Sequence, residues 1–129
     1  MTTELDYAYL ADYAAVEGGR LTAVGASFTH VQTATLPVVK MLSVAGRVRT
    51  SDDSEGFRLG VMLRSPDGEW ALGFDGFVDA AGARPYDGKK GVLFALQTSV
   101  TLTTAGLYTV DISIEGQPVR TLKFDVTEV

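Results

Sequence analysis

Hydrophobic and polar residues alternate with a period of two along most of the chain, and no stretch shows the spacing of an amphipathic helix. The clearest alternation runs from Tyr108 to Ile114, where apolar side chains fall on one face and polar side chains on the other. The pattern recurs in the ranges 5–16, 20–32, 41–50, 57–65, 70–78, 94–102 and 122–126. It predicts about eight strands in all, and therefore an all-β fold.

Turn-forming residues separate these ranges. Ser65-Pro66-Asp67-Gly68 predicts a tight turn, because proline presets φ, aspartate caps the turn and glycine accepts a positive φ. Glu17-Gly18-Gly19 predicts a long hairpin that pairs 5–16 with 20–32. The remaining irregular stretches are 33–39 and 79–91, and the second is the longest loop.

Short strands at regular spacing are typical of an antiparallel β-sandwich or barrel. Several of the expected strands are long, which favours a sandwich, either immunoglobulin-like or jelly-roll-like. The chain has 129 residues, so we expect a single domain that spans 1–129. A chain of this length can bury a sufficient core without disulfides.

Two stretches carry a resemblance to known families. The segment 11–26, with Gly18-Gly19-Arg20 at its centre, resembles a small bacterial family of about this length that is known only as a domain of unknown function. That resemblance implies no activity. The segment 102–110 is similar to the penultimate hairpin of immunoglobulin-like sandwiches, where a Gly-x-Tyr enters a strand. The resemblance implies that Tyr108 closes this corner by a hydrogen bond back to the backbone.

Composition narrows the chemistry. Cysteine and asparagine are absent and His30 is the one histidine, which excludes disulfides, thiol nucleophiles and histidine-rich metal sites within the chain. The net charge of −5 argues against nucleic acid and against anionic membranes as partners. The sequence has no signal-peptide pattern and no long apolar run, so we expect a cytoplasmic bacterial protein without a cofactor.

No catalytic constellation stands out. His30 falls near the end of an expected strand, and no serine sits in a Gly-x-Ser-x-Gly turn. The carboxylate pairs that acid–base chemistry would need are Asp75 with Asp79 or Asp67 with Glu69, and both have simpler interpretations as turn or surface residues. We therefore expect no enzyme, and carboxylate-based catalysis is the third alternative.

Two charged groups are weaker candidates. Asp52, Asp53 and Glu55 crowd one turn and are a weak calcium candidate, since their spacing is not that of an EF-hand and a flexible hairpin tip explains them equally. If 41–50 pairs with 57–65, a basic stripe forms on the outer face. Either the acidic residues of the tip neutralise this stripe, or the stripe contacts an acidic partner. The stripe would consist of Arg47, Arg49, Arg58 and Arg64.

Tyrosines are the most unusual feature of the chain. Tyr7, Tyr9 and Tyr13 share one face of the first expected strand, and small residues lie opposite them in the expected hairpin. They form either an exposed contact surface or part of the core; Asp12, on the other face, supports the second interpretation. The loop 79–91 adds Arg84 and Tyr86 as candidate contacts.

These observations favour a non-catalytic binding module whose partner is a protein, either a different one or another copy of the chain. The expected contact surface is Tyr7, Tyr9 and Tyr13 with Arg84 and Tyr86 of the long loop. The alternative is a small-ligand module, such as a carbohydrate-binding sandwich, that uses the same aromatics together with Trp70 or Tyr86.

Overall fold

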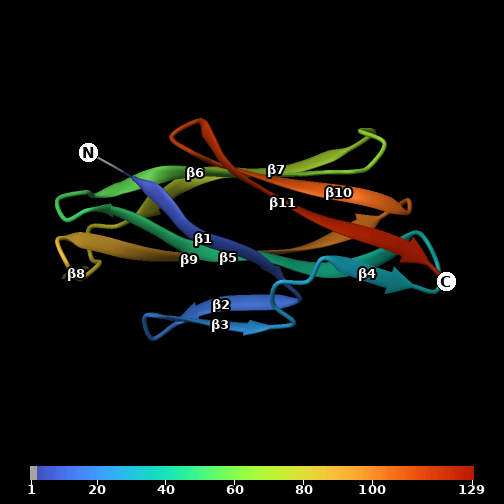
Figure 1. The fold of residues 1–129 in the computed structure, drawn as a ribbon, viewed down its shortest axis with the longest axis horizontal. Helices are drawn as coiled ribbons and strands as arrows, with labels where there is room; N and C mark the ends of the chain where they lie inside the picture. Colours follow the sequence, from blue (N-terminus) through green and yellow to red (C-terminus); the bar gives the residue numbers. More distant parts are fainter. Residues whose placement is uncertain (1–2) are drawn as a thin grey trace.

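The computed structural model describes residues 3–129, which form two β-sheets packed face to face and a separate hairpin (Figure 1). This confirms the all-β sandwich. The four-stranded sheet has the order β1 (Glu4–Ala11), β5 (Val38–Ser51), β9 (Lys89–Leu102) and β8 (Pro85–Tyr86). The five-stranded sheet has the order β4 (His30–Thr33), β11 (Gln117–Glu128), β10 (Gly106–Ile114), β6 (Gly56–Arg64) and β7 (Ala71–Asp79). The hairpin consists of β2 (Tyr13–Glu17) and β3 (Arg20–Val24).

The core lies between the two sheets and is built from the apolar faces that the alternation indicates. On β10, Tyr108, Val110 and Ile112 are fully buried, and on β6 Phe57 and Leu59 are fully buried. Side chains of this size each contribute about 1.5–3 kcal/mol when they are removed from water. The two sheets are therefore held together chiefly by these inward-facing side chains.

The prediction of a long N-terminal hairpin between 5–16 and 20–32 is wrong. β1 instead pairs with β5, with Leu10 opposite Val44, and only the short segments β2 and β3 pair around the Gly18-Gly19 turn. Gly25, directly after β3, and Ser27 have positive φ angles of 63° and 64°, which interrupt the extended chain between β3 and β4. The N–H of Ser27 then donates to the carbonyl oxygen of Leu10.

The hairpin β2–β3 covers part of the outer face of the four-stranded sheet. Three small residues, Ala11, Ala14 and Ala45, are buried where it lies against β5 and β9. The N–H of Ala14 donates to the hydroxyl of Ser43 at 3.1 Å, which ties the hairpin to β5. Small side chains at this contact let the two layers approach closely.

On the side of the sandwich opposite β1 and β4, both sheets end in an edge that is unpaired along most of its length among residues 3–129. β7 is the edge strand of the five-stranded sheet. β8 pairs only with Lys89 and Lys90, so the rest of β9 has a neighbour, β5, on one side alone. The expected irregular stretch 79–91 thus contains β8 and the start of β9, and this arrangement positions both surfaces described next.

Candidate functional site: two contact surfaces

Aromatic and guanidinium side chains from three strands meet on the outer face of the four-stranded sheet. We call this the Tyr–Arg surface; it consists of Tyr7 and Tyr9 on β1, Arg47 and Arg49 on β5, and Tyr86 on β8. The rings of Tyr7 and Tyr9 stack with centroids 6.4 Å apart and planes at 11°. The Arg47 guanidinium lies 5.1 Å from the Tyr7 ring centroid, and that of Arg49 lies 5.8 Å from the Tyr86 centroid.

Strand register and one glycine create this arrangement. Tyr7 on β1 lies opposite Arg47 on β5, and Gly91 on β9 lies opposite Arg49. A Cβ on Gly91 would lie 3.2 Å from the Arg47 side chain and 3.3 Å from the Tyr86 ring. Because Gly91 has no side chain, Arg47 and Tyr86 can both pack over the sheet at this point.

Electrostatic contacts hold the surface in place. Arg47 donates from both Nε and Nη2 to Asp6 Oδ2, and this hydrogen-bonded ion pair raises the pKa of Arg47. Burial, followed by the neighbouring Tyr7, raises the pKa of Tyr9 above 10.0. Arg49 has a buried Nε without a hydrogen-bond partner among the described residues. Tyr86 is 47% exposed, whereas the other four side chains are half-buried.

The surface unites five of the residues that the sequence singled out and leaves others elsewhere. Tyr13 is exposed on the hairpin, where it lies opposite Val24 rather than opposite a small residue as expected. Arg84 is exposed in the loop before β8. The opposite face of β1 carries Leu10, which is buried in the core between the sheets.

The predicted single basic stripe is wrong, because β5 and β6 belong to different sheets and do not pair. Arg47 and Arg49 lie on the outer face of the four-stranded sheet. Arg58 and Arg64 lie on the outer face of the other sheet, where Arg58 pairs with Asp75 at 3.3 Å and Arg64 with Asp111 at 3.4 Å. The chain crosses between sheets at the turn 51–56, which the alternation alone read as a hairpin tip.

The acidic turn and the single histidine have structural contacts of their own. Asp53 accepts a hydrogen bond from the Ser51 hydroxyl at 2.8 Å, and within residues 3–129 no three acidic or histidine side chains gather as a metal site, Asp52 and Glu55 included. His30 Nε2 lies 2.7 Å from the Thr127 hydroxyl on the surface. None of residues 3–129 forms a helix that could cross a lipid bilayer.

The carboxylates considered for acid–base chemistry are held in surface contacts. Asp67 caps its own turn, accepting hydrogen bonds from the hydroxyl of Ser65 and the N–H of Glu69. Asp79 caps the turn that follows β7 by accepting a hydrogen bond from the N–H of Ala81 at 2.9 Å.

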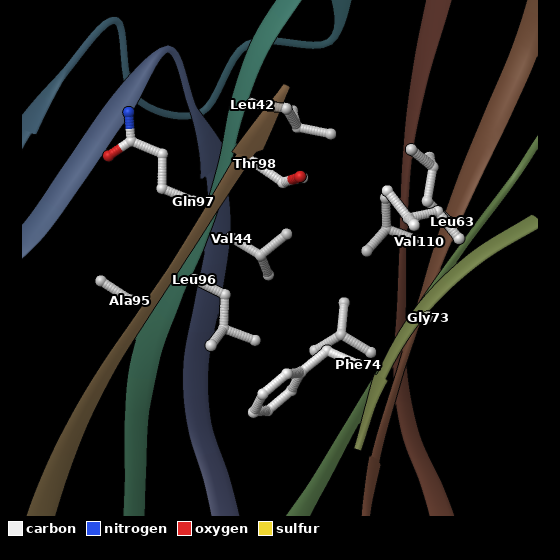
Figure 2. Close-up of a pocket in the computed structure, with 12 residues that line it drawn as sticks. Leu42, Val44, Leu63, Gly73, Phe74, Ala95, Leu96, Gln97, Thr98 and Val110 are labelled. Carbon is white, nitrogen blue, oxygen red and sulfur yellow. The ribbon is translucent and has the colours of Figure 1, made fainter. Parts of the chain in front are cut away.

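A second surface, which the sequence analysis missed, is an apolar cleft between the open edges of β7 and β9 (Figure 2). Its cavity has a volume of about 430 Å³. Leu72 and Phe74 of β7 stand at its opening, 43% and 45% exposed, and Leu96 of β9 lies across from Phe74. None of the side chains that line the cleft is ionisable; the remaining ones are Leu42, Val44, Val61, Leu63, Gly73, Ala95, Gln97, Thr98 and Val110.

The alternation did place Leu72 and Phe74 on the inward face of the sandwich, which the pairing of Leu72 with Leu63 and of Phe74 with Val61 confirms. It could not show that their strand would be an edge. A second cavity of about 320 Å³ continues past Leu72 and is lined by Trp70 and Thr101, among others.

Two layers of strands that are antiparallel except for the parallel pair β4–β11, packed around one core, define an immunoglobulin-like β-sandwich. The crystal structure of an immunoglobulin-like protein from Pseudomonas aeruginosa is similar over 98% of each chain, with a TM-score of 0.51 and 13% identity. This chain belongs to the family of unknown function DUF6941, whose model matches residues 6–127, as the resemblance in the N-terminal segment predicts.

A weaker structural likeness covers a part of a larger protein. The alkylpurine DNA glycosylase AlkC of Pseudomonas fluorescens, bound to DNA with an abasic site analog, matches 92% of this chain with a TM-score of 0.47 and 7% identity. The match covers 30% of that protein. No curated protein sequence matches this chain.

Proposed function

We propose that this protein is a non-catalytic protein-binding module and that the Tyr–Arg surface is its contact site. The observation that carries the proposal is the convergence of Arg47 and Tyr86 over Gly91, with the Tyr7 ring packed against Arg47. Tyrosine and arginine are, together with tryptophan, the side chains enriched in the energetic centres of protein interfaces. Their arrangement over one sheet face provides a contact area of aromatic rings and fixed cationic groups.

The surface is already ordered before a partner arrives. The Tyr7–Tyr9 stack, the Arg47–Asp6 ion pair and the cation–π contacts fix most of the rotamers. Ordering such side chains on binding normally costs about 0.5–1.5 kcal/mol for each one. A partner that offers an aromatic ring or a carboxylate would therefore meet a preorganised site.

The geometry does not favour a carbohydrate platform that includes Trp70. The Trp70 ring packs against the buried Tyr108 with centroids 6.0 Å apart, and its indole N–H donates to the hydroxyl of Thr103 at 3.0 Å. It lines the smaller cavity beside β9 rather than the Tyr–Arg surface. The aromatics thus do not form one continuous stacking face.

Affinity capture from the native host, quantified by mass spectrometry, tests the proposal with three variants as bait. Tyr86→Ala and Tyr9→Glu remove parts of the Tyr–Arg surface, whereas Tyr13→Ala removes a tyrosine of similar exposure on the hairpin. We expect a specific partner whose recovery, relative to that with wild-type bait, falls at least about tenfold with the first two variants and stays unchanged with the third. Equal recovery from all baits, each shown to be folded by its melting curve, would overturn the proposal.

A further inference from the structure

The outer edges of the two sheets differ in how they are protected against pairing with another chain. β1 carries Glu4 and Asp6 and has a register shift between Leu5 and Tyr7. β4 has four residues, and β8 has two and begins at Pro85. Charges, bulges, prolines and short lengths are the usual devices that keep an edge strand from recruiting a partner.

β7 carries two carboxylates, Asp75 and Asp79, but none of the other devices. It is nine residues long, pairs with β6 without a register shift, and contains neither lysine nor proline. Leu72, Phe74 and Phe77 are 43%, 45% and 62% exposed along it. A long, regular edge strand with exposed apolar side chains is a template for strand pairing.

The open part of β9, residues 91–102, has the same character on the other side of the cleft. It contains no ionisable residue and no proline. The cleft between the two edges is lined without a charged side chain, although 21% of the chain is charged. The surface that covers this cleft therefore needs to be uncharged and apolar, because a charge buried there would have no counterion.

We propose that a second copy of this chain covers the cleft. The chain itself carries a strand that meets this requirement, since the inward face of β7 is apolar and its two carboxylates, Asp75 and Asp79, lie on the outward face. A two-fold axis perpendicular to the sheets would set β7 antiparallel to β7 of the second copy and bring the two open β9 edges toward each other. Both sheets then continue across the interface, and the half-exposed Leu72 and Phe74 of both copies become buried together.

The residues of β7 restrict the register of this pairing. Leu72, Phe74 and Val78 share the inward face, and opposed residues must lie on the same face. A register centred on Asp75 would set two carboxylates directly opposite each other, which is destabilising. A register centred on Phe74 instead pairs the two phenylalanine rings and sets Asp75 opposite Gly73 of the second copy, where there is no side chain to exclude it.

Sedimentation equilibrium from micromolar to millimolar concentration tests the proposal. We expect the wild type to reach twice 13.7 kDa, and Phe74→Lys to raise the dissociation constant at least about tenfold. Leu107→Lys is the matched control, because Leu107 is 47% exposed on β10, and it is expected to dimerise like the wild type. If Phe74→Lys does not fold, Leu72→Lys provides the same test from the same side of β7.

Because the chain has no cysteine, a single introduced thiol reports the register directly. Phe74→Cys is expected to oxidise to a covalent dimer, since residues on the axis face each other at disulfide distance. Phe77→Cys is expected to form no disulfide-linked dimer under the same conditions, although Phe77 is more exposed.

Three results would overturn the proposal. The first is a wild type that stays monomeric throughout the concentration range. The second is a dimer that Tyr9→Glu dissociates and Phe74→Lys does not, which would place the interface on the Tyr–Arg surface. The third is a monomer that binds the apolar dye anilinonaphthalenesulfonate and loses it with Phe74→Lys, which would assign the cleft to a small apolar ligand.

Discussion

The hydroxyl of Tyr108 donates a hydrogen bond of 2.8 Å to the carbonyl oxygen of Thr104, and the N–H of Thr104 donates back to the same hydroxyl at 3.3 Å. The tyrosine is fully buried, and its ring lies between Trp70 and Phe124 with centroid distances of 6.0 and 5.1 Å. It thereby anchors the turn that connects β9 to β10. The role that the resemblance to immunoglobulin-like hairpins implies for Tyr108 is confirmed.

Replacement of Tyr108 by phenylalanine is expected to lower the free energy of unfolding by roughly 1–3 kcal/mol. The ring keeps its packing, whereas the N–H and C=O of Thr104 lose their partner in a partly buried turn. Urea denaturation measures the change. Tyr13→Phe, on the exposed hairpin, is the control and is expected to shift the stability by less than about 0.5 kcal/mol. Equal stability of Tyr108→Phe and wild type would show that the hydrogen bond is not needed.

The inward faces of most strands could be predicted from the sequence, because burial on one side of a sheet imposes a period of two. The pairing of strands could not. Alternation is the same whether 41–50 and 57–65 form a hairpin or cross between sheets, and in the structure they lie in different sheets. In the same way, the break at Gly25 and Ser27 separates β3 from β4, and no hydrophobic pattern marks a positive φ at a serine.

The Tyr–Arg surface could be predicted in its residues but not in its grouping. Tyr7 and Tyr86 are distant in the sequence, and they meet the arginines of β5 because β1 and β8 lie at opposite ends of a sheet that contains β5 and β9. The cleft was missed for a related reason. Leu72 and Phe74 look like core residues in the sequence, and their exposure follows from the position of β7 at an edge.

Lys90 is buried, and its Nζ donates to the carbonyl oxygens of Ser54 and Ala80, each at 3.0 Å. It joins the turn before β6 to the turn after β7. Lys90→Met would leave the Ser54 carbonyl without this donor, so we expect a loss of roughly 1–3 kcal/mol of stability. Hydrogen exchange is expected to increase in both turns. Lys89→Met is the comparison, since its exposed contact with Glu4 at 3.8 Å is worth about 0–1 kcal/mol; a comparable loss in both variants would contradict the assignment.

Gly46 lies where β1 comes close to β5. A Cβ at this position would overlap the carbonyl oxygen of Tyr7 and lie 3.0 Å from the ring of Phe94. Gly46→Ala is therefore expected to cost roughly 1–3 kcal/mol and to displace Tyr7 from Arg47.

Gly82→Ala is the matched control for this substitution, because a Cβ there has no atom within 4 Å. We expect it to be neutral or stabilising by up to about 1 kcal/mol. Thermal denaturation measures the stability of both variants. A Gly46→Ala protein as stable as Gly82→Ala would show that β1 can shift without cost.

Asp67 accepts hydrogen bonds from the hydroxyl of Ser65 at 2.7 Å and from the N–H of Glu69 at 3.0 Å. The Ser65 hydroxyl, followed by the Glu69 N–H, lowers the pKa of Asp67 below 3.8. A carboxyl group whose pKa is lower in the folded protein stabilises the fold above its unfolded pKa, and this contribution disappears as the pH falls through the folded pKa. Wild type is therefore expected to lose stability relative to Asp67→Asn as the pH decreases below 3.8.

NMR titration of the Asp67 carboxyl measures the pKa shift directly. Ser65→Ala is expected to raise this pKa toward 3.8, whereas Ser65→Thr, which keeps the hydroxyl, is expected to leave it low. A carboxyl that titrates at or above 3.8 in the wild type would show that the turn does not stabilise its charge.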